Sequence, residues 1–205
     1  VHVADSASIT IKDAAENWIT SCRSRLGEGT LDQYQQHVNL HIVPFVGREK
    51  ISRVTVPLVR AFEDTLHANG RSAAMVRAVR VSLGALLSDA QERGHVVRNA
   101  VRELSGKRGR RHPREQRRKR KLKIGIDIPT PEEVRALLAK AKGSFRPLLL
   151  TAVFTGLRAS ELRGLRWIDV DLHRSELHVR QRADKYNTMG RPKSEAGERT
   201  IPRTP

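Results

Sequence analysis

The residues best suited to chemistry lie in one short stretch, Thr155-Gly156-Leu157-Arg158-Ala159-Ser160-Glu161-Leu162. Gly156 predicts the end of a helix and a sharp turn, which places Arg158 beside the first turn of the next helix. A guanidinium near unpaired backbone N–H groups suits an anion such as a phosphate. Glu161, three residues later, is in reach of Arg158 and would hold its side chain in one orientation. An ordinary surface ion pair, which contributes little, is the alternative, and the residues alone leave both open.

The charge balance favours a polyanionic partner. The chain has 39 Lys and Arg against 22 Asp and Glu, a net charge of +17, and its sequence pI is near 11.2. Such a field attracts nucleic acid. Eleven of the basic residues lie between Gly106 and Ile124, with one acidic residue. This basic segment is predicted to be a linker that contacts DNA, with a solvated charged tether as the alternative.

The elements that precede this segment are predicted to be four amphipathic helices with short connections, which is typical of a helical bundle. The first is capped by Thr10 and Asp13, and Cys22 on its apolar stripe is expected in the core, since one thiol makes no internal disulfide. The others are expected to begin at Thr30, Thr55 and Ser72. The helix from Thr30 is expected to end at Pro44 and Gly47.

The part that carries Arg158 is predicted to be an α+β domain. Thr130 caps a helix, residues 145–154 are apolar almost all round and predict a buried helix, and a short helix follows through Leu165. Period-two patterns then predict strands over 167–172, 176–182 and 199–201. The fold class is therefore mainly α with a small antiparallel sheet. The predicted parts are a helical domain at 1–100, a basic linker at 101–128 and the second domain at 129–205.

Residues 155–165, followed by Trp167-Ile168-Asp169-Val170, resemble the first catalytic box of the tyrosine recombinase (phage integrase) family. The resemblance implies that the helical region is a core-binding (SAM-like) DNA-binding domain and that residues 129–205 are the N-terminal part of a catalytic domain of the DNA breaking-rejoining type. Arg158 matches the arginine that binds the scissile phosphate, and Glu161 matches the acidic residue that supports it.

The family also places a lysine in a turn between strands, and two residues are candidates. Lys193 is preferred, because residues 192–202 resemble the loop and strand of many integrases; Lys185 is the alternative, and either would otherwise be a solvated loop lysine. Further basic residues are expected to contact DNA, although a charged solvent face explains those near the long helix equally well: Arg71, Arg77, Arg80, Arg117, Arg118, Lys119, Arg120 and Lys121.

The family's remaining groups are a His-x-x-Arg box, a further His or Trp and a nucleophilic Tyr, all expected beyond the sheet. No His follows His178, and neither Tyr34 nor Tyr186 stands where the nucleophile is expected. The resemblance therefore implies a site-specific recombinase of a mobile genetic element that acts through a phosphotyrosyl intermediate, with these 205 residues inactive by themselves.

The implied partner is double-stranded DNA, on which the intact protein would form a homotetramer. No metal or other cofactor and no membrane are expected, and a DNA-associated, cytoplasmic protein of bacterial or phage origin is implied. One rival is a catalytically inactive DNA-binding fragment or decayed homologue. Another is a basic RNA-associated protein, which leaves the Arg158 turn unexplained.

Overall fold

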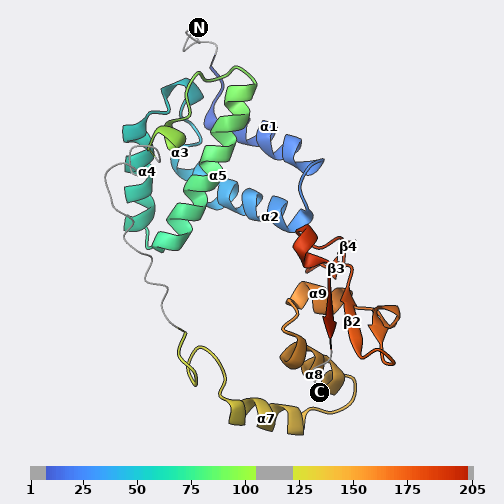
Figure 1. Ribbon diagram of the computed structural model, residues 1–205. Coiled ribbons are helices and arrows are strands. Elements are labelled where there is room, and N and C mark those ends of the chain that lie inside the picture. The colour runs from blue at the N-terminus through green and yellow to red at the C-terminus, as the bar shows by residue number, and fades with distance from the viewer. Residues whose placement is uncertain (1–7, 105–121, 203–205) are drawn as a thin grey trace. The chain divides into compact units, whose positions relative to one another are not determined.

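The chain divides into two compact units, Val1–Arg117 and Arg118–Pro205. The structure is a computed structural model that describes residues 8–104 and 122–202 (Figure 1). The fold class is confirmed: it is mostly helical, with small antiparallel sheets. The predicted limits of the domains and linker stay predictions.

The first unit consists of helices that begin where capping side chains lie. Thr10 and Asp13 form the predicted capping box, and Ser72 accepts from the backbone N–H of Met75. Thr55 caps its helix in the same way, with Pro57 in the first turn. The elements are α1 (Ile11–Arg23), α2 (Glu28–His37), the π-helical turn η2 (Val38–Ile42), α3 (Val43–Val46), the 3-10 turn η3 (Ile51–Arg53), α4 (Val56–Ala68) and α5 (Ala73–Glu92).

The second helix differs from the prediction at its start. It begins at Glu28, with Gly27 as N-cap, two residues before the predicted start at Thr30. Its end at Gly47 agrees with the prediction, because the chain continues through η2 into α3, where Pro44 lies in the first turn and Gly47 is the C-cap. The N–H of Val43 donates to the carbonyl of Val38, a π-type bond, and a proline in a first turn needs no N–H partner.

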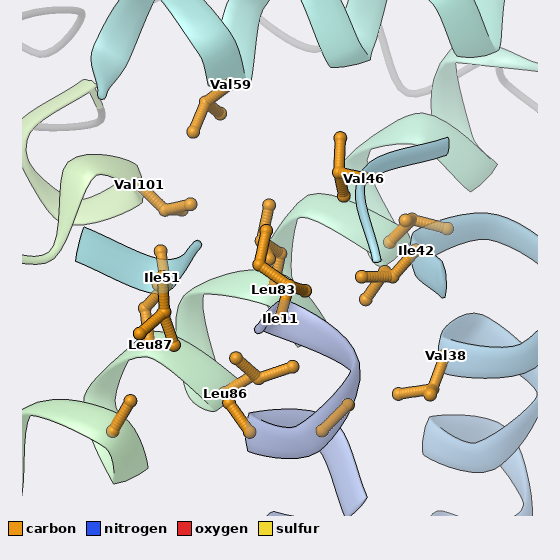
Figure 2. Close-up of a cluster of buried hydrophobic side chains, with 14 of the residues drawn as sticks. Ile11, Val38, Ile42, Val46, Ile51, Val59, Leu83, Leu86, Leu87 and Val101 are labelled. Carbon is orange, nitrogen blue, oxygen red and sulfur yellow. The ribbon is translucent and has the colours of Figure 1, made fainter. Parts of the chain in front are cut away.

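The core of the first unit gathers buried side chains from α1, α4 and α5 and from the turns η2 and η3 (Figure 2). Leu83, Leu86 and Leu87 of α5 lie at its centre and are almost fully buried, and Cys22 is buried as predicted. Val101 and Leu104 are also buried in this core. The packed part of the unit therefore continues four residues into the segment predicted as linker.

The second unit places three helices before two small sheets. The helices are α7 (Pro131–Lys140), α8 (Phe145–Thr155) and α9 (Ala159–Gly164). A 3-10 turn η4 (Trp167–Asp169) leads to β1 (Val170–Asp171), β2 (Glu176–Val179), β3 (Arg182–Ala183), β4 (Met189–Gly190), the 3-10 turn η5 (Glu195–Gly197) and β5 (Arg199–Pro202). One sheet has the antiparallel order β1-β2-β5, with Leu177 opposite Ile201, and β3 pairs with β4 as a separate hairpin.

Two predictions for this unit are wrong. The helix expected to be buried, α8, has no buried residue within the described part of the chain, and Phe154 is 68% exposed. The strand expected over 167–172 is reduced to Val170–Asp171, because the N–H of Asp169 donates to the carbonyl of Arg166 and closes a 3-10 turn. Trp167 on that turn is exposed, so its apolar character did not mark an inward-facing strand position.

Close packing of α9 on β3 depends on a glycine, which gives a first prediction. A Cβ added at Gly164 would lie 2.7 Å from Cα of Arg182 and 2.9 Å from N of Ala183, so backbone would have to move. We expect Gly164→Ala to lower the free energy of unfolding of this unit by about 1–3 kcal/mol, measured by urea denaturation. Gly190→Ala is the control, since its Cβ would meet only the Arg182 guanidinium, at 4.0 Å. Equal stability of the two variants would contradict the prediction.

Candidate arginine site at the start of helix α9

Arg158 lies at the N-cap of α9, immediately after the turn that ends α8. Gly156 has φ of 61°, in the left-handed region, and so allows the chain to turn between the helices as predicted. The Arg158 side chain is 73% exposed. Its Nη1 donates to Glu161, and Nε and Nη2 make no hydrogen bond among the described residues. Several N–H donors therefore remain available to an external anion.

Glu161 is the buried centre of the site. Its side chain is 3% exposed, and both carboxylate oxygens accept hydrogen bonds. The Arg158 backbone N–H donates to Oε2 over 3.1 Å, and Nη1 of Arg158 donates to Oε1 over 2.8 Å. Arg199 of β5 donates from Nη2 to Oε2 over 2.9 Å and from Nη1 to Oε1 over 3.3 Å. The predicted contact between Arg158 and Glu161 is thus present, and a second arginine joins it.

These bonds lower the pKa of Glu161 from 4.5 to about 2. The largest cause is the hydrogen bonding from Arg199, followed on the lowering side by the backbone and side chain of Arg158; burial acts in the opposite direction. Glu161 is therefore a permanent carboxylate at neutral pH, and the three side chains carry a net charge of +1.

The depressed pKa predicts a pH-dependent contribution to stability. A folded-state pKa below the unfolded value stabilises the fold above pH 4.5, and this contribution is lost as the pH falls from about 4.5 towards about 2. We expect Glu161→Gln to cost about 2–3 kcal/mol of unfolding free energy at pH 7 and progressively less below pH 4.5. The measurement is urea denaturation across pH 3–7, with Glu132→Gln on exposed α7 as the control. A cost that does not shrink in acid would contradict the assignment.

Arg199 was missed as a site residue by the sequence reasoning. It lies within the 192–202 segment whose loop and strand were noted, but no spacing along the chain relates it to Glu161, 38 residues earlier. The contact requires the register of the sheet, in which Arg199 stands opposite Val179 of β2. The sequence indicates this contact only through the position of Arg199, at the start of a predicted strand that follows the candidate lysine loop.

The two candidate lysines occupy different loops. Lys193 is exposed and lies between β4 and η5. Lys185 lies in the turn of the β3–β4 hairpin, with Nζ 4.6 Å from the ring centroid of Tyr186. Within the described residues, the carboxylate of Glu161 accepts from two arginines and from no lysine. The choice of Lys193 over Lys185 stays a prediction.

The basic residues predicted to contact DNA are placed unequally in the first unit. Arg71 and Arg77 are exposed, and Arg77 lines an open groove between α2 and α5 with Thr30 and Gln33. Arg80 is mostly buried and pairs with Glu63 over 3.0 Å. The other predicted contacts lie outside the described residues: Arg117, Arg118, Lys119, Arg120 and Lys121.

A second buried carboxylate, Asp169, supports the turn after α9. Its side chain is 1% exposed and accepts from Nε of Arg166 over 2.8 Å and from Nη2 over 3.2 Å. Nη1 of Arg180 lies 3.6 Å from Oδ1 of Asp169. Hydrogen bonding from Arg166 is the main cause that lowers the pKa of Asp169. This cluster ties η4 to the residue that follows β2.

Neither a membrane-spanning helix nor a cluster of metal-ligating side chains is found in residues 8–104 and 122–202. Their helices are too short or too polar to cross a bilayer. No three His, Cys, Asp or Glu side chains of these ranges gather closely enough to hold a metal ion.

Comparison with known proteins gives a consistent set of relatives. The family model described as "Phage integrase, N-terminal SAM-like domain" matches residues 10–67. The tyrosine recombinase XerC-like protein of Caldanaerobacter subterraneus subsp. tengcongensis is 26% identical over 214 residues, which covers 97% of this chain and 53% of that protein. The prophage integrase IntR of Escherichia coli K12 is 38% identical over 79 residues, which covers 38% of this chain and 19% of IntR.

Solved structures of the same kind have the same fold. The Tn1549 transposon integrase, in complex with a circular intermediate DNA, superposes with a TM-score of 0.69 at 18% identity, covering 96% of this chain and 62% of that one. A lambda integrase dimer bound to a COC′ core site gives a TM-score of 0.63 at 21% identity, and the match covers 95% of this chain and 49% of the lambda integrase chain. The chain therefore spans about half the length of the XerC-like relative and of the lambda integrase chain.

Proposed function

Because this chain belongs to the tyrosine recombinase (phage integrase) family, we propose that it supplies the phosphate-binding part of a site-specific DNA recombinase. The observation that carries the proposal is the geometry of Arg158, whose exposed guanidinium donates a hydrogen bond to the buried carboxylate of Glu161. A buried anion that orients an exposed cation leaves most of the guanidinium donors for a phosphate.

In the proposed reaction, a tyrosine hydroxyl attacks a DNA phosphodiester. The phosphorus–oxygen bond to the 5′-oxygen breaks, a phosphotyrosyl bond forms, and the 5′-oxygen leaves as a hydroxyl. The bond energy is retained in the phosphotyrosyl link, so rejoining needs no nucleotide triphosphate. Arg158 would stabilise the negative charge that develops on the non-bridging oxygens. Lys193 would donate the proton to the departing 5′-oxygen, a general-acid role worth roughly 10²–10⁴-fold.

Neither of the chain's two tyrosines is assigned as that nucleophile. Tyr34 packs on Trp18 in the first unit, with ring centroids 4.7 Å apart, and Tyr186 lies in the β3–β4 turn. The proposed role of the 205 residues is therefore to bind duplex DNA and the scissile phosphate. Cleavage is proposed only for a full-length product that supplies the tyrosine.

Duplex DNA is the proposed partner. The net charge of +17 and the exposed Arg71 and Arg77 support it, whereas the pairing of Arg80 with Glu63 makes Arg80 a weaker candidate. The basic residues Arg117, Arg118, Lys119, Arg120 and Lys121 remain part of the proposal. The proposed parts are a core-binding domain at 1–100, a linker at 101–128 and the start of a catalytic domain at 129–205. A lambda integrase tetramer is known on a Holliday junction, and we extend that assembly to the intact protein.

The experiment is a search for the covalent adduct. The full-length gene product is incubated with nicked suicide duplexes tiled across the DNA that flanks its gene, and the products are separated under denaturing conditions. A protein–DNA adduct that is sensitive to protease and resistant to heat is expected on one duplex. Tight duplex binding without any adduct would overturn the proposal in favour of a DNA-binding module, and preference for structured RNA would favour the RNA-associated rival.

A further inference from the structure

Arg199 directs its guanidinium inward, in contrast to Arg158. Its side chain is only 32% exposed. Nη2 donates to Oε2 of Glu161 over 2.9 Å, and Nη1 is shared between Oε1 of Glu161 at 3.3 Å and the carbonyl of Gly197 at 3.1 Å. Both terminal nitrogens of Arg199 are thus occupied within the protein, which suits a group that orders its neighbours rather than one that binds a ligand.

Arg158 has the opposite character. It is 73% exposed and gives one terminal nitrogen to the same carboxylate. If Arg199 were absent, the buried carboxylate of Glu161 would have Arg158 as its one remaining cationic partner. The pair would be electrically neutral, and the Glu161 carboxylate, no longer tied to β5, would hold Arg158 less firmly in one direction. With Arg199 present, the cluster keeps a charge of +1 for an anion.

The bond to Gly197 connects the same guanidinium to the loop that carries Lys193. A Cβ at Gly197 would lie 2.6 Å from Cβ of Pro192, so the loop folds back on itself and brings its two ends into contact. The N–H of Gly197 donates to the carbonyl of Ser194 over 2.8 Å, which closes the 3-10 turn. Arg199 therefore joins the end of the lysine loop to the carboxylate that holds the phosphate-binding arginine.

We infer that Arg199 is a positioning residue for the recombination site: it fixes the carboxylate of Glu161, through which Arg158 is aimed, and anchors the Lys193 loop through Gly197. The inference rests on the proposed function. Arg199 touches neither the phosphate nor the tyrosine in this scheme, and its loss acts through the geometry of Arg158 and Lys193. Misplacement of such groups by about 1 Å costs on the order of 10²-fold in rate.

The test compares Arg199→Gln and Arg199→Lys in single-turnover cleavage of a suicide duplex by the full-length gene product. We expect Arg199→Gln to slow cleavage about 10- to 100-fold, while the Kd for duplex DNA changes less than about threefold. Arg199→Lys keeps the charge but cannot form the two-pronged contact, so it is expected to fall between Arg199→Gln and the wild type. Arg163→Gln is the matched control, an exposed arginine of α9 whose side chain, within the described part of the chain, hydrogen-bonds only to the carbonyl of Ala183.

A double-variant cycle separates positioning from a merely structural role. If Arg199 acts through Glu161, adding Glu161→Gln to Arg199→Gln is expected to slow cleavage less than about threefold further. The inference would be overturned if the slowing in the double variant equalled the product of the two single effects. It would also be overturned if Arg199→Gln cleaved as fast as the Arg163→Gln control. The third contradicting outcome is a slowing no larger than the loss of folded protein measured by circular dichroism. If Arg199→Gln does not fold, Arg199→Lys carries the same comparison.

A second readout keeps the inference distinct from the proposed function. The absence of any adduct from the wild type would remove the proposed function and leave the positioning of Arg158 to be measured in the 205-residue chain. There the Arg158 Nε–H order parameter from NMR is expected to fall below about 0.6 in Arg199→Gln, the range of flexible groups. An unchanged order parameter would overturn the positioning role.

Discussion

Arg158→Ala is expected to slow strand cleavage by the full-length gene product by at least about 10²–10³-fold, the cost of removing one preorganised donor from a developing oxyanion. The duplex affinity is expected to change less than about threefold, since many other phosphate contacts remain. The reason lies in the geometry of the turn: the guanidinium is exposed, yet a buried carboxylate fixes its direction 2.8 Å away. Single-turnover cleavage of a suicide duplex and a filter-binding titration measure the two quantities.

Arg135→Ala is a closely matched control for this prediction. Arg135 is 77% exposed and also pairs with a glutamate three positions away along a helix, Glu132. Its partner is itself 74% exposed, so that pair is a surface contact of little energetic weight. Cleavage by Arg135→Ala should therefore equal that of the wild type. Normal cleavage by Arg158→Ala, or equal loss in both variants, would contradict the proposed role of Arg158 in phosphate binding.

The sequence predicted the local part of the site because that part depends on neighbours along the chain. Gly156 ends one helix, Arg158 caps the next, and Glu161 is one helical turn further on. These relations follow from backbone geometry and short spacing. Arg199 could not be found in this way, because its place beside Glu161 is set by the pairing of β2 with β5.

The errors in the fold have a related cause. An apolar sequence predicts burial only when a partner surface is present, and the exposed Phe154 and Trp167 have none among the described residues that covers them. Periodicity also cannot separate a short strand from a 3-10 turn such as Trp167–Asp169. Helix starts were predicted well where Thr or Ser supplies a capping oxygen, and poorly at α2, where Gly27 has no side chain to mark the cap.

Binding of the 205-residue chain to duplex DNA is expected to weaken by about 10³–10⁵-fold between 50 and 200 mM salt, which corresponds to about 6–10 neutralised phosphates. The net charge of +17 permits contacts on this scale, and 11 of the basic residues lie between Gly106 and Ile124. Replacing five of these by Gln is expected to reduce the log–log salt slope by about 4.5, at about 0.9 per lost phosphate contact. The five are Arg117, Arg118, Lys119, Arg120 and Lys121.

A charge-matched variant distinguishes these contacts from the field of the whole chain. Five exposed basic residues of the helices and their flanks are replaced instead: Lys12, Arg23, Arg25, Arg135 and Lys140. Both variants lose five charges, so a long-range field would change their salt slopes equally, whereas direct phosphate contacts would reduce the slope only in the first. The salt slope counts the counterions released by phosphate contacts, not the net charge of the protein. Equal slopes in the two variants would therefore exclude residues 117–121 as the main DNA contacts. The exposed arginines near α5 would then be the remaining candidates for those contacts.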